Sequence, residues 1–227
     1  MKTFAATAAS KRLITGYPSL FPLRPAGHPF AMKSAFRAFA SCAAALLVML
    51  PAASARADGD DTALTNLVAL VSQRLSLAEP VAHWKWLNHK PITDTPRENA
   101  LLADVQKRAA AAGVDPAFAR TFFRDQIDAS TQVQQALFKS WQSSQAPAGP
   151  APDLATVTRP QLDRLTARLI GALARVQPTR AADDCPARVA RAVANWKELT
   201  RYDSTRAEAM IRALGHVCEG GGVGGMA

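Results

Sequence analysis

The sequence predicts an all-α fold, a single-domain helical bundle of about six helices. Apolar residues recur at the spacing of helix faces along most of the chain, and no strand alternation, internal repeat or Gly-rich phosphate loop is present. Asp and Pro residues open several of these stretches in the positions that helix starts favour. The length of 227 residues is enough for one domain with a sizeable core.

Residues 1–57 have the layout of a leader that directs export. Lys33 and Arg37 precede an apolar stretch over 38–50, and Ala55 and Ala57 form an A-x-A cleavage site with the mature chain starting near Asp58. We therefore expect a signal peptide over 32–57, and a periplasmic or secreted protein. Residues 1–31 fit no part of a signal peptide and indicate an over-long gene start.

Charge argues against nucleic acid as a partner. The whole chain has a net charge of +9, but residues 1–57 hold seven of the 27 Lys/Arg and none of the 18 Asp/Glu, which leaves 20 against 18 in the remainder. The mature chain is thus nearly neutral, and its sequence shows no basic stripe with interleaved aromatic residues that would bind nucleic acid. The apolar stretch of the leader is too short for a comfortable membrane span, so no membrane partner is expected after its removal.

Two cysteines remain once the leader and Cys42 are removed. An even pair in an exported protein predicts a disulfide, here Cys185–Cys218, with two free structural thiols as the alternative. The chain has no CxxC motif and no His/Cys ligand spacing, so no metal site is expected.

The helices can be placed from their caps, stripes and breaks. The first is expected to start at the cap formed by residues 60–62 and to bend or break at Pro80. Others are expected over 94–112, which Gly113 ends, over 115–141, and over 159–176. Two shorter helices joined by the cysteines follow. The domain thus covers 58–219, and the Gly-rich tail 220–227 is expected to be disordered.

Three cations stand in apolar surroundings between Gln73 and Glu98. Arg74 lies on the apolar face of the first helix, and Lys85, eleven residues later, points the same way if the segment is mostly helical. Arg97 follows at the start of the next helix. A buried cation is unfavourable unless an anion meets it. One such residue is explained by an internal salt bridge or a snorkelling side chain, whereas three together favour a small anionic ligand.

The long helix carries two polar residues within an apolar stripe. Ser130 and Gln134 occupy the centre of one face, and the rest of that face is apolar: Phe123, Ile127, Leu137 and Trp141. A buried hydroxyl or amide without a partner costs about 1–3 kcal/mol. The pair therefore indicates a buried polar network, a register-setting pair, or a polar pocket facing the cations. Arg159, on the apolar face of the helix over 159–176, could close such a pocket.

These residues together resemble the all-helical chorismate mutases. The family pattern has Arg and Lys eleven apart, Asp nine residues after the Lys, Arg-Glu next, then Ser and Gln four apart on a later helix. The sequence matches it with Arg74, Lys85, Asp94, Arg97, Glu98, Ser130 and Gln134. The export signal, the cysteine pair and the length resemble the secreted subclass. The resemblance covers about residues 62–218.

The resemblance implies a rearrangement of chorismate to prephenate without a cofactor. Arg74, Arg159 and Lys85 would hold the carboxylates of this dianion. Lys85 and Gln134 would donate to the breaking ether oxygen, which makes them the catalytic pair. The remaining implied roles are orientation of the substrate by Arg97, binding of the ring carboxylate by Ser130, and binding of the ring hydroxyl by Glu98 with the backbone at Asp94. A homodimer with each pocket built within one chain is also implied.

The sequence departs from the secreted subclass at two positions. Gln134 stands where some secreted members have Glu, and Thr131 stands where Glu is common, so the contact to the ring hydroxyl could lie elsewhere than at Glu98. Two other functions remain open. One is an exported helical binding or effector protein without turnover, and the other is a relative that processes isochorismate.

Overall fold

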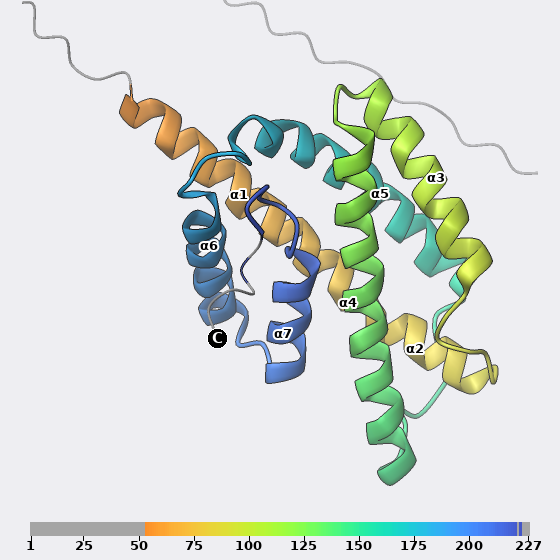
Figure 1. The fold of residues 1–227 in the computed structure, drawn as a ribbon. Coiled ribbons are helices and arrows are strands. Elements are labelled where there is room, and N and C mark those ends of the chain that lie inside the picture. Colours follow the sequence, from red (N-terminus) through yellow and green to blue (C-terminus); the bar gives the residue numbers. More distant parts are fainter. Residues whose placement is uncertain (1–52, 222, 224–227) are drawn as a thin grey trace, which may run out of the picture. The chain divides into compact units, whose positions relative to one another are not determined.

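The structure is a computed structural model that describes residues 53–221 and 223, and the side chains only from residue 61 onward. Its described part contains seven α-helices and no strand (Figure 1). The all-α prediction is therefore confirmed. The helices are α1 (Ala53–Ser76), α2 (Ala78–Leu87), α3 (Thr95–Ala111), α4 (Pro116–Ser143), α5 (Arg159–Val176), α6 (Cys185–Thr200) and α7 (Ser204–Ala213).

The first predicted helix is two helices, because the chain breaks at Leu77 rather than at Pro80. Leu77 N–H bonds to the Arg74 carbonyl, three residues back, and its own carbonyl accepts from Val81 N–H. Pro80 then falls in the first turn of α2, where a residue without an N–H is tolerated. The break turns the chain between Arg74, at the end of α1, and Lys85, near the end of α2.

The predicted start of the first helix is wrong. Helix α1 begins at Ala53, ahead of the cap expected at Asp60, Asp61 and Thr62. Asp61 instead accepts a 2.8 Å hydrogen bond from Arg188 Nε and so connects α1 to α6. A carboxylate inside a helix is free to pair with a neighbouring helix, and this tertiary contact is not visible in the local sequence.

Helix α3 starts and ends, and helix α4 starts, at the positions that their capping residues predict. Asp94 accepts from Arg97 N–H at the start of α3, and Asp115 accepts from Ala117 N–H at the start of α4. Gly113 follows α3 with a φ of +72°, a conformation that glycine adopts without strain. These two helices pack against each other as a helical hairpin.

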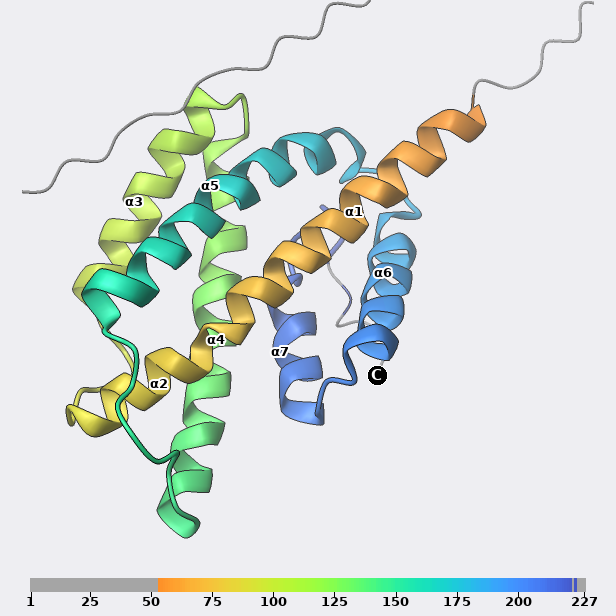
Figure 2. The same cartoon turned by 180° about the vertical axis from the view of Figure 1, so that it is seen from behind.

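Helix α5 has its predicted bounds, but a π-helical turn over Leu154–Thr158 precedes it. This turn packs against α2 as well as α5, and Figure 2 shows the segment between α4 and α5 passing beside α2. Asp153 caps the turn by accepting from Thr156 N–H at 2.7 Å. The turn buries Leu154 and so adds an apolar wall between α2 and α5.

The core forms where α1 packs against α5 and α6, and where α4 packs against α2, α3 and α7. Its largest fully buried side chains include Phe122 and Phe123, whose rings meet edge to face at 5.5 Å. The apolar stripe of α1 is buried as predicted, with Leu67, Val71 and Leu75 each no more than 2% exposed. Helices α1 to α5 thereby pack into one unit, and the cavity described below lies among them.

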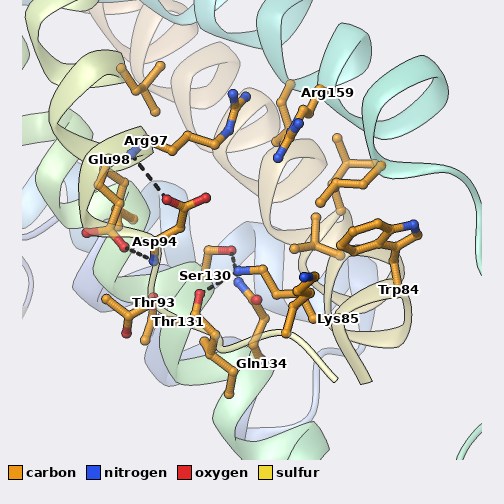
Figure 3. Close-up of a pocket in the computed structure, with 18 of the residues that line it drawn as sticks. Trp84, Lys85, Thr93, Asp94, Arg97, Glu98, Ser130, Thr131, Gln134 and Arg159 are labelled. Atoms are coloured by element: carbon orange, nitrogen blue, oxygen red, sulfur yellow. Dashed lines mark hydrogen bonds between the residues drawn. The ribbon is translucent and has the colours of Figure 1, made fainter. Parts of the chain in front are cut away.

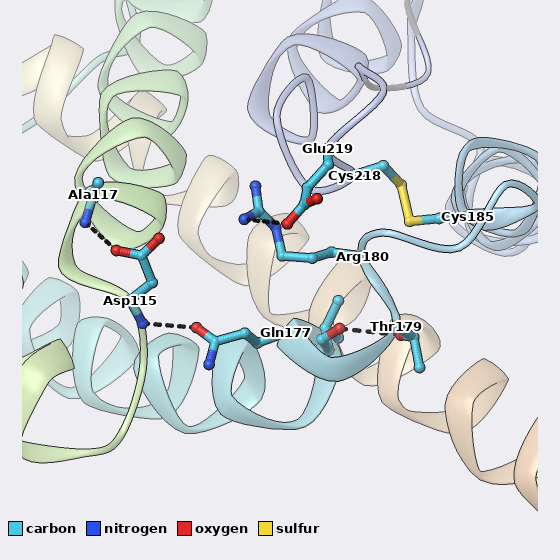
Figure 4. A network of polar contacts seen from close by, with 9 residues as sticks. Asp115, Ala117, Gln177, Thr179, Arg180, Cys185, Cys218 and Glu219 are labelled. Carbon is cyan, nitrogen blue, oxygen red and sulfur yellow. Dashed lines mark hydrogen bonds and ion pairs between the residues drawn. A yellow bond between two sulfur atoms is a disulfide. The ribbon is translucent and has the colours of Figure 1, made fainter.

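The predicted disulfide Cys185–Cys218 is present, with an S–S distance of 2.00 Å (Figure 4). Closing a loop of 33 residues stabilises a fold by about 3–4 kcal/mol in the chain-entropy model. Arg180 lies beside the bridge, bonds to Glu219 and stacks over the Phe118 ring at 4.0 Å. These contacts fasten the segment after α7 to the region where α4 begins.

Part of the expected organisation lies outside the described residues. The leader over 1–57, with its signal peptide and the suggested over-long start at 1–31, falls almost wholly there, as does most of the tail over 220–227. Within the described residues, no helix is long and apolar enough to cross a membrane.

Candidate active site

A cavity of about 660 Å³ lies among the end of α1, α2, the start of α3, the middle of α4 and the start of α5. This volume is typical of a small-molecule site. All eight predicted site residues line it: Arg74, Lys85, Asp94, Arg97, Glu98, Ser130, Gln134 and Arg159. Residues from one chain therefore supply the whole predicted set, and Figure 3 shows the side chains of the other seven besides Arg74 around the cavity.

Arg74 is the most deeply buried cation of the cavity. Its side chain is 7% exposed, and its Nε and Nη1 have no hydrogen-bond partner among the described residues. Burial lowers the pKa of Arg74 to about 10, an effect that the nearby Asp163 carboxylate partly opposes. The Phe123 ring lies 5.9 Å from its guanidinium carbon. Arg74 forms no salt bridge with any residue that the structure describes, so the internal pair that would explain it without a ligand is missing there, which favours an anionic ligand.

Arg97 and Arg159 extend into the cavity from α3 and α5. Arg97 is exposed, so the expected burial of the three cations between Gln73 and Glu98 is wrong for Arg97, because it lies at the open start of α3. Figure 3 shows their guanidinium groups on the same side of the cavity, above the Asp94 carboxylate. Arg159 is half-buried, and its Nε also lacks a partner in the described part. Three guanidinium groups thus surround one space, and an anion in that space would relieve their mutual repulsion.

Lys85 projects into the cavity from α2 and is held by the loop that follows. Its Nζ donates a hydrogen bond to the Ile92 carbonyl. Burial lowers the pKa of Lys85, while the carboxylates of Asp94 and Glu98 oppose this shift. An ammonium group has three donors, so two remain for a ligand after the bond to Ile92.

Ser130 and Gln134 face the cavity from adjacent turns of α4. Gln134 is 4% exposed, and its Nε2 donates to Ser130 Oγ at 3.0 Å, while its Oε1 is buried without a partner. The orientation of the amide follows from these bonds. The two residues bond to each other and also line the cavity. The structure therefore agrees with two of the interpretations of the sequence, the buried polar network and the polar pocket. One N–H of Gln134 stays free to donate into the cavity.

Asp94 and Glu98 form the start of α3 and one edge of the cavity. Asp94 Oδ1 accepts from Arg97 N–H, and Glu98 Oε1 accepts from the Asp94 N–H at 3.2 Å (Figure 3). This is a reciprocal cap of the kind that fixes helix starts. Glu98 Oε2 accepts from Arg124 Nη1 of α4 at 3.1 Å. The carboxylate of Glu98 is therefore held on both oxygens.

Sequence reasoning missed several lining residues. Asp163 and Thr166 lie one and two turns after Arg159 on α5, and helical periodicity from Arg159 could have found them. Trp84 adjoins Lys85 in the sequence. Leu154 belongs to the π-helical turn, and no local signal would have placed it in the cavity.

The donors in this cavity suit a small, multiply charged anion. No His or Cys is among the described residues that line it. No group of three or more His, Cys, Asp or Glu side chains in the described part could hold a metal ion. The residues can orient an anion and stabilise negative charge that develops on it.

Comparison with known proteins agrees with this geometry. The model of the family "Chorismate mutase type II" matches residues 64–135. The secreted chorismate mutase of Mycolicibacterium smegmatis is 32% identical over 180 residues, which cover 79% of this chain and 98% of that protein. The secreted chorismate mutase of Mycobacterium tuberculosis is 30% identical over 165 residues, or 73% and 82% of the two chains.

A solved structure supports the same assignment. The chorismate mutase of Burkholderia thailandensis is 71% identical and superimposes with a TM-score of 0.68, over 69% of this chain and 99% of that one. The matches to these relatives cover 82–98% of the two secreted proteins and 99% of the solved chain, so they extend beyond the cavity. The chain therefore belongs to the chorismate mutase family of the all-helical type II.

Proposed function

We propose that this chain converts chorismate to prephenate in the cavity between α1 and α5. The observation that carries the proposal is the buried Arg74 guanidinium, which has free donors and converges with Lys85 and Gln134 on one space. Chorismate is a dianion, so its carboxylates supply the negative charge that would neutralise these cations. The names of the relatives agree with this substrate.

The cations bind and orient the substrate. Arg74 and Arg159 hold carboxylate groups by charge-assisted hydrogen bonds, which are about twice as strong as neutral ones. Ser130 binds the ring carboxylate, and Arg97 orients the substrate from the start of α3. Glu98, with the backbone at Asp94, accepts the ring hydroxyl. Binding in this way selects the compact conformer in which the two reacting carbons meet.

Catalysis then rests on electrostatic stabilisation by Lys85 and Gln134. The rearrangement is unimolecular and needs no nucleophile and no proton transfer, but negative charge develops on the ether oxygen as its bond breaks. Lys85 has two donors beyond its bond to Ile92, and Gln134 has one beyond its bond to Ser130. Both are fixed in place before the substrate arrives, so they stabilise this charge without reorganisation.

The proposed function is tested by replacing Lys85 with Ala. We expect the native protein to consume chorismate, measured by loss of its absorbance, and kcat of Lys85→Ala to fall at least about 100-fold, or about 3 kcal/mol. Lys139→Ala is the matched control, because Lys139 is exposed on α4 away from the cavity and should leave kcat unchanged. A folded native protein that leaves chorismate intact would refute the enzyme function and favour a binding protein; turnover of isochorismate instead would favour that alternative.

The pH dependence tests the role of Gln134. A neutral amide donates at every pH, so kcat should stay nearly flat between pH 5 and 8. Because burial lowers the pKa of Lys85, activity should fall on the alkaline side at a lower pH than the ordinary lysine value of 10.5 would give. In Gln134→Glu the donor must be a protonated carboxyl, so the rate should fall steeply above about pH 6. A native enzyme that loses activity above pH 6 would contradict this role of Gln134.

Arg74 should favour function at the expense of stability. Burial lowers the pKa of Arg74 to about 10 in the folded chain, so its charge destabilises the fold below pH 10, and the penalty is relieved as the pH rises above 10. We expect Arg74→Met to raise the free energy of unfolding by about 1–2 kcal/mol in urea titrations and to lower kcat/KM at least about 100-fold. The control Arg164→Met, on the exposed face of α5, should change stability by less than about 0.5 kcal/mol. A less stable Arg74→Met protein would show that Arg74 supports the fold.

Export and assembly complete the proposal. The leader layout over 32–57, together with relatives that are named secreted proteins, supports a protein exported to the periplasm or beyond the cell and cleaved near Ala57. The resemblance further supports a homodimer. N-terminal sequencing of the exported protein should give Asp58 as its first residue, and light scattering should give twice the chain mass. An uncleaved N-terminus would contradict the leader, and a monomer mass would contradict the dimer.

A further inference from the structure

We infer that Arg124, which lies outside the lining of the cavity, is a positioning residue for the substrate site. It holds the Glu98 carboxylate at the cavity edge and away from the cations that bind the substrate. This inference rests on the proposed function, in which Glu98 accepts the ring hydroxyl of chorismate. It assigns a task to an ion pair between α3 and α4 that the binding residues alone do not explain.

The first observation is the geometry of the pair. Arg124 Nη1 lies 3.1 Å from Glu98 Oε2, and the two side chains are 38% and 18% exposed. The other oxygen of Glu98 accepts from the Asp94 N–H. Each carboxylate oxygen can accept two hydrogen bonds, so one site per oxygen stays available for a substrate hydroxyl. Arg124 therefore fixes the carboxylate without using up its capacity to accept.

The second observation is what surrounds Glu98 on the cavity side. Asp94 and Glu98 both lie close enough to Lys85 to raise its pKa against the effect of burial, and Arg97 follows Asp94 in the same turn. A Glu98 side chain released from Arg124 would be drawn towards these cations. It would then compete with the carboxylates of the substrate for the same donors. Arg124 opposes this competition by pairing with Glu98 from outside the cavity.

The third observation is that Lys85 has a restraint of its own. Its Nζ donates to the Ile92 carbonyl, whereas Arg124 bonds to Glu98, which in turn accepts from the Asp94 N–H. Loss of Arg124 therefore releases Glu98 and the start of α3, while the catalytic ammonium keeps its bond to Ile92. The hydroxyl and its contact to Glu98 do not change charge in the rearrangement. Loss of this contact should weaken the ground state and the transition state equally, which raises KM and leaves kcat unchanged.

The test is a double-mutant cycle with a matched control on the same helix. The variants are Arg124→Gln, Glu98→Gln, the double variant, and Arg120→Gln. Arg120 lies one turn before Arg124 and joins α4 to α3 through Gln106 at 3.2 Å, but neither residue lines the cavity. Thermal unfolding of each variant reports its fold. If Arg124→Gln does not fold, Arg124→Met, which keeps the side-chain length without the charge, replaces it in the cycle.

We expect Arg124→Gln to raise KM for chorismate about 3- to 10-fold with kcat within about twofold, and Arg120→Gln to change neither. In the Glu98→Gln background the Arg124 substitution should have less than a twofold effect on KM, because the competing carboxylate is gone. The inference is overturned if KM of Arg124→Gln is native, if Arg120→Gln raises KM equally, or if the effect persists at full size without the Glu98 charge.

A second measurement does not depend on turnover. Hydrogen exchange of the segment 91–98 should be faster in Arg124→Gln than in the native protein and in Arg120→Gln, because the Asp94 N–H loses a fixed acceptor. Unchanged exchange there would also overturn the inference. If exchange responds as expected but the native protein does not turn over chorismate, the proposed function fails while the restraint on Glu98 stands.

Discussion

The arrangement of this protein depends on one unfavourable condition, a guanidinium group inside the domain that forms no ion pair with any described residue. Arg74 is placed there by the packing of α1 against α5 and is kept charged in part by the nearby Asp163 carboxylate. The apolar stripe of α1 and the aromatic pair of α4 supply the burial that makes this possible. A buried cation without a partner favours binding of an anion, and a dianionic substrate supplies one. The other cations of the cavity can pair with its second carboxylate.

Most of the fold follows from local chemistry that the sequence displays. Asp94, Asp115 and Gly113 act as predicted because a cap or a left-handed turn depends on a few neighbouring residues. Arg74 and Gln134 could be found because burial makes polar side chains on apolar faces conspicuous, whereas an exposed residue such as Asp94 depended on the order that the resemblance supplied. Cys185 and Cys218 form the predicted bridge. These features share one property, which is that each is determined within one or two turns of helix or by a pairing with no competitor.

Other features depend on contacts between distant segments and were not predictable. Asp61 has the composition of a cap but pairs with Arg188, 127 residues away. The break at Leu77 moved the end of α1 ahead of Pro80, since the turn can satisfy its hydrogen bonds there and still place the proline in the first turn of α2. The π-helical turn that contributes Leu154 and the ion pair of Arg124 with Glu98 have no periodic signature, because each reports how two helices meet.

The disulfide Cys185–Cys218 and the Arg180–Glu219 ion pair, here called the C-terminal clasp, have a further consequence for how the sequence of this protein can evolve. None of the described residues after Thr166 lines the cavity, whereas the disulfide and the ion pair of Arg180 with Glu219 both lie in that later part of the chain. The residues that bind the ligand and the residues of this clasp therefore lie in different stretches of one sequence. Substitutions in α6 and α7 can alter how long the molecule survives in a harsh environment while its recognition of a ligand stays the same. Lineages that share the cavity are free to diverge widely in this clasp.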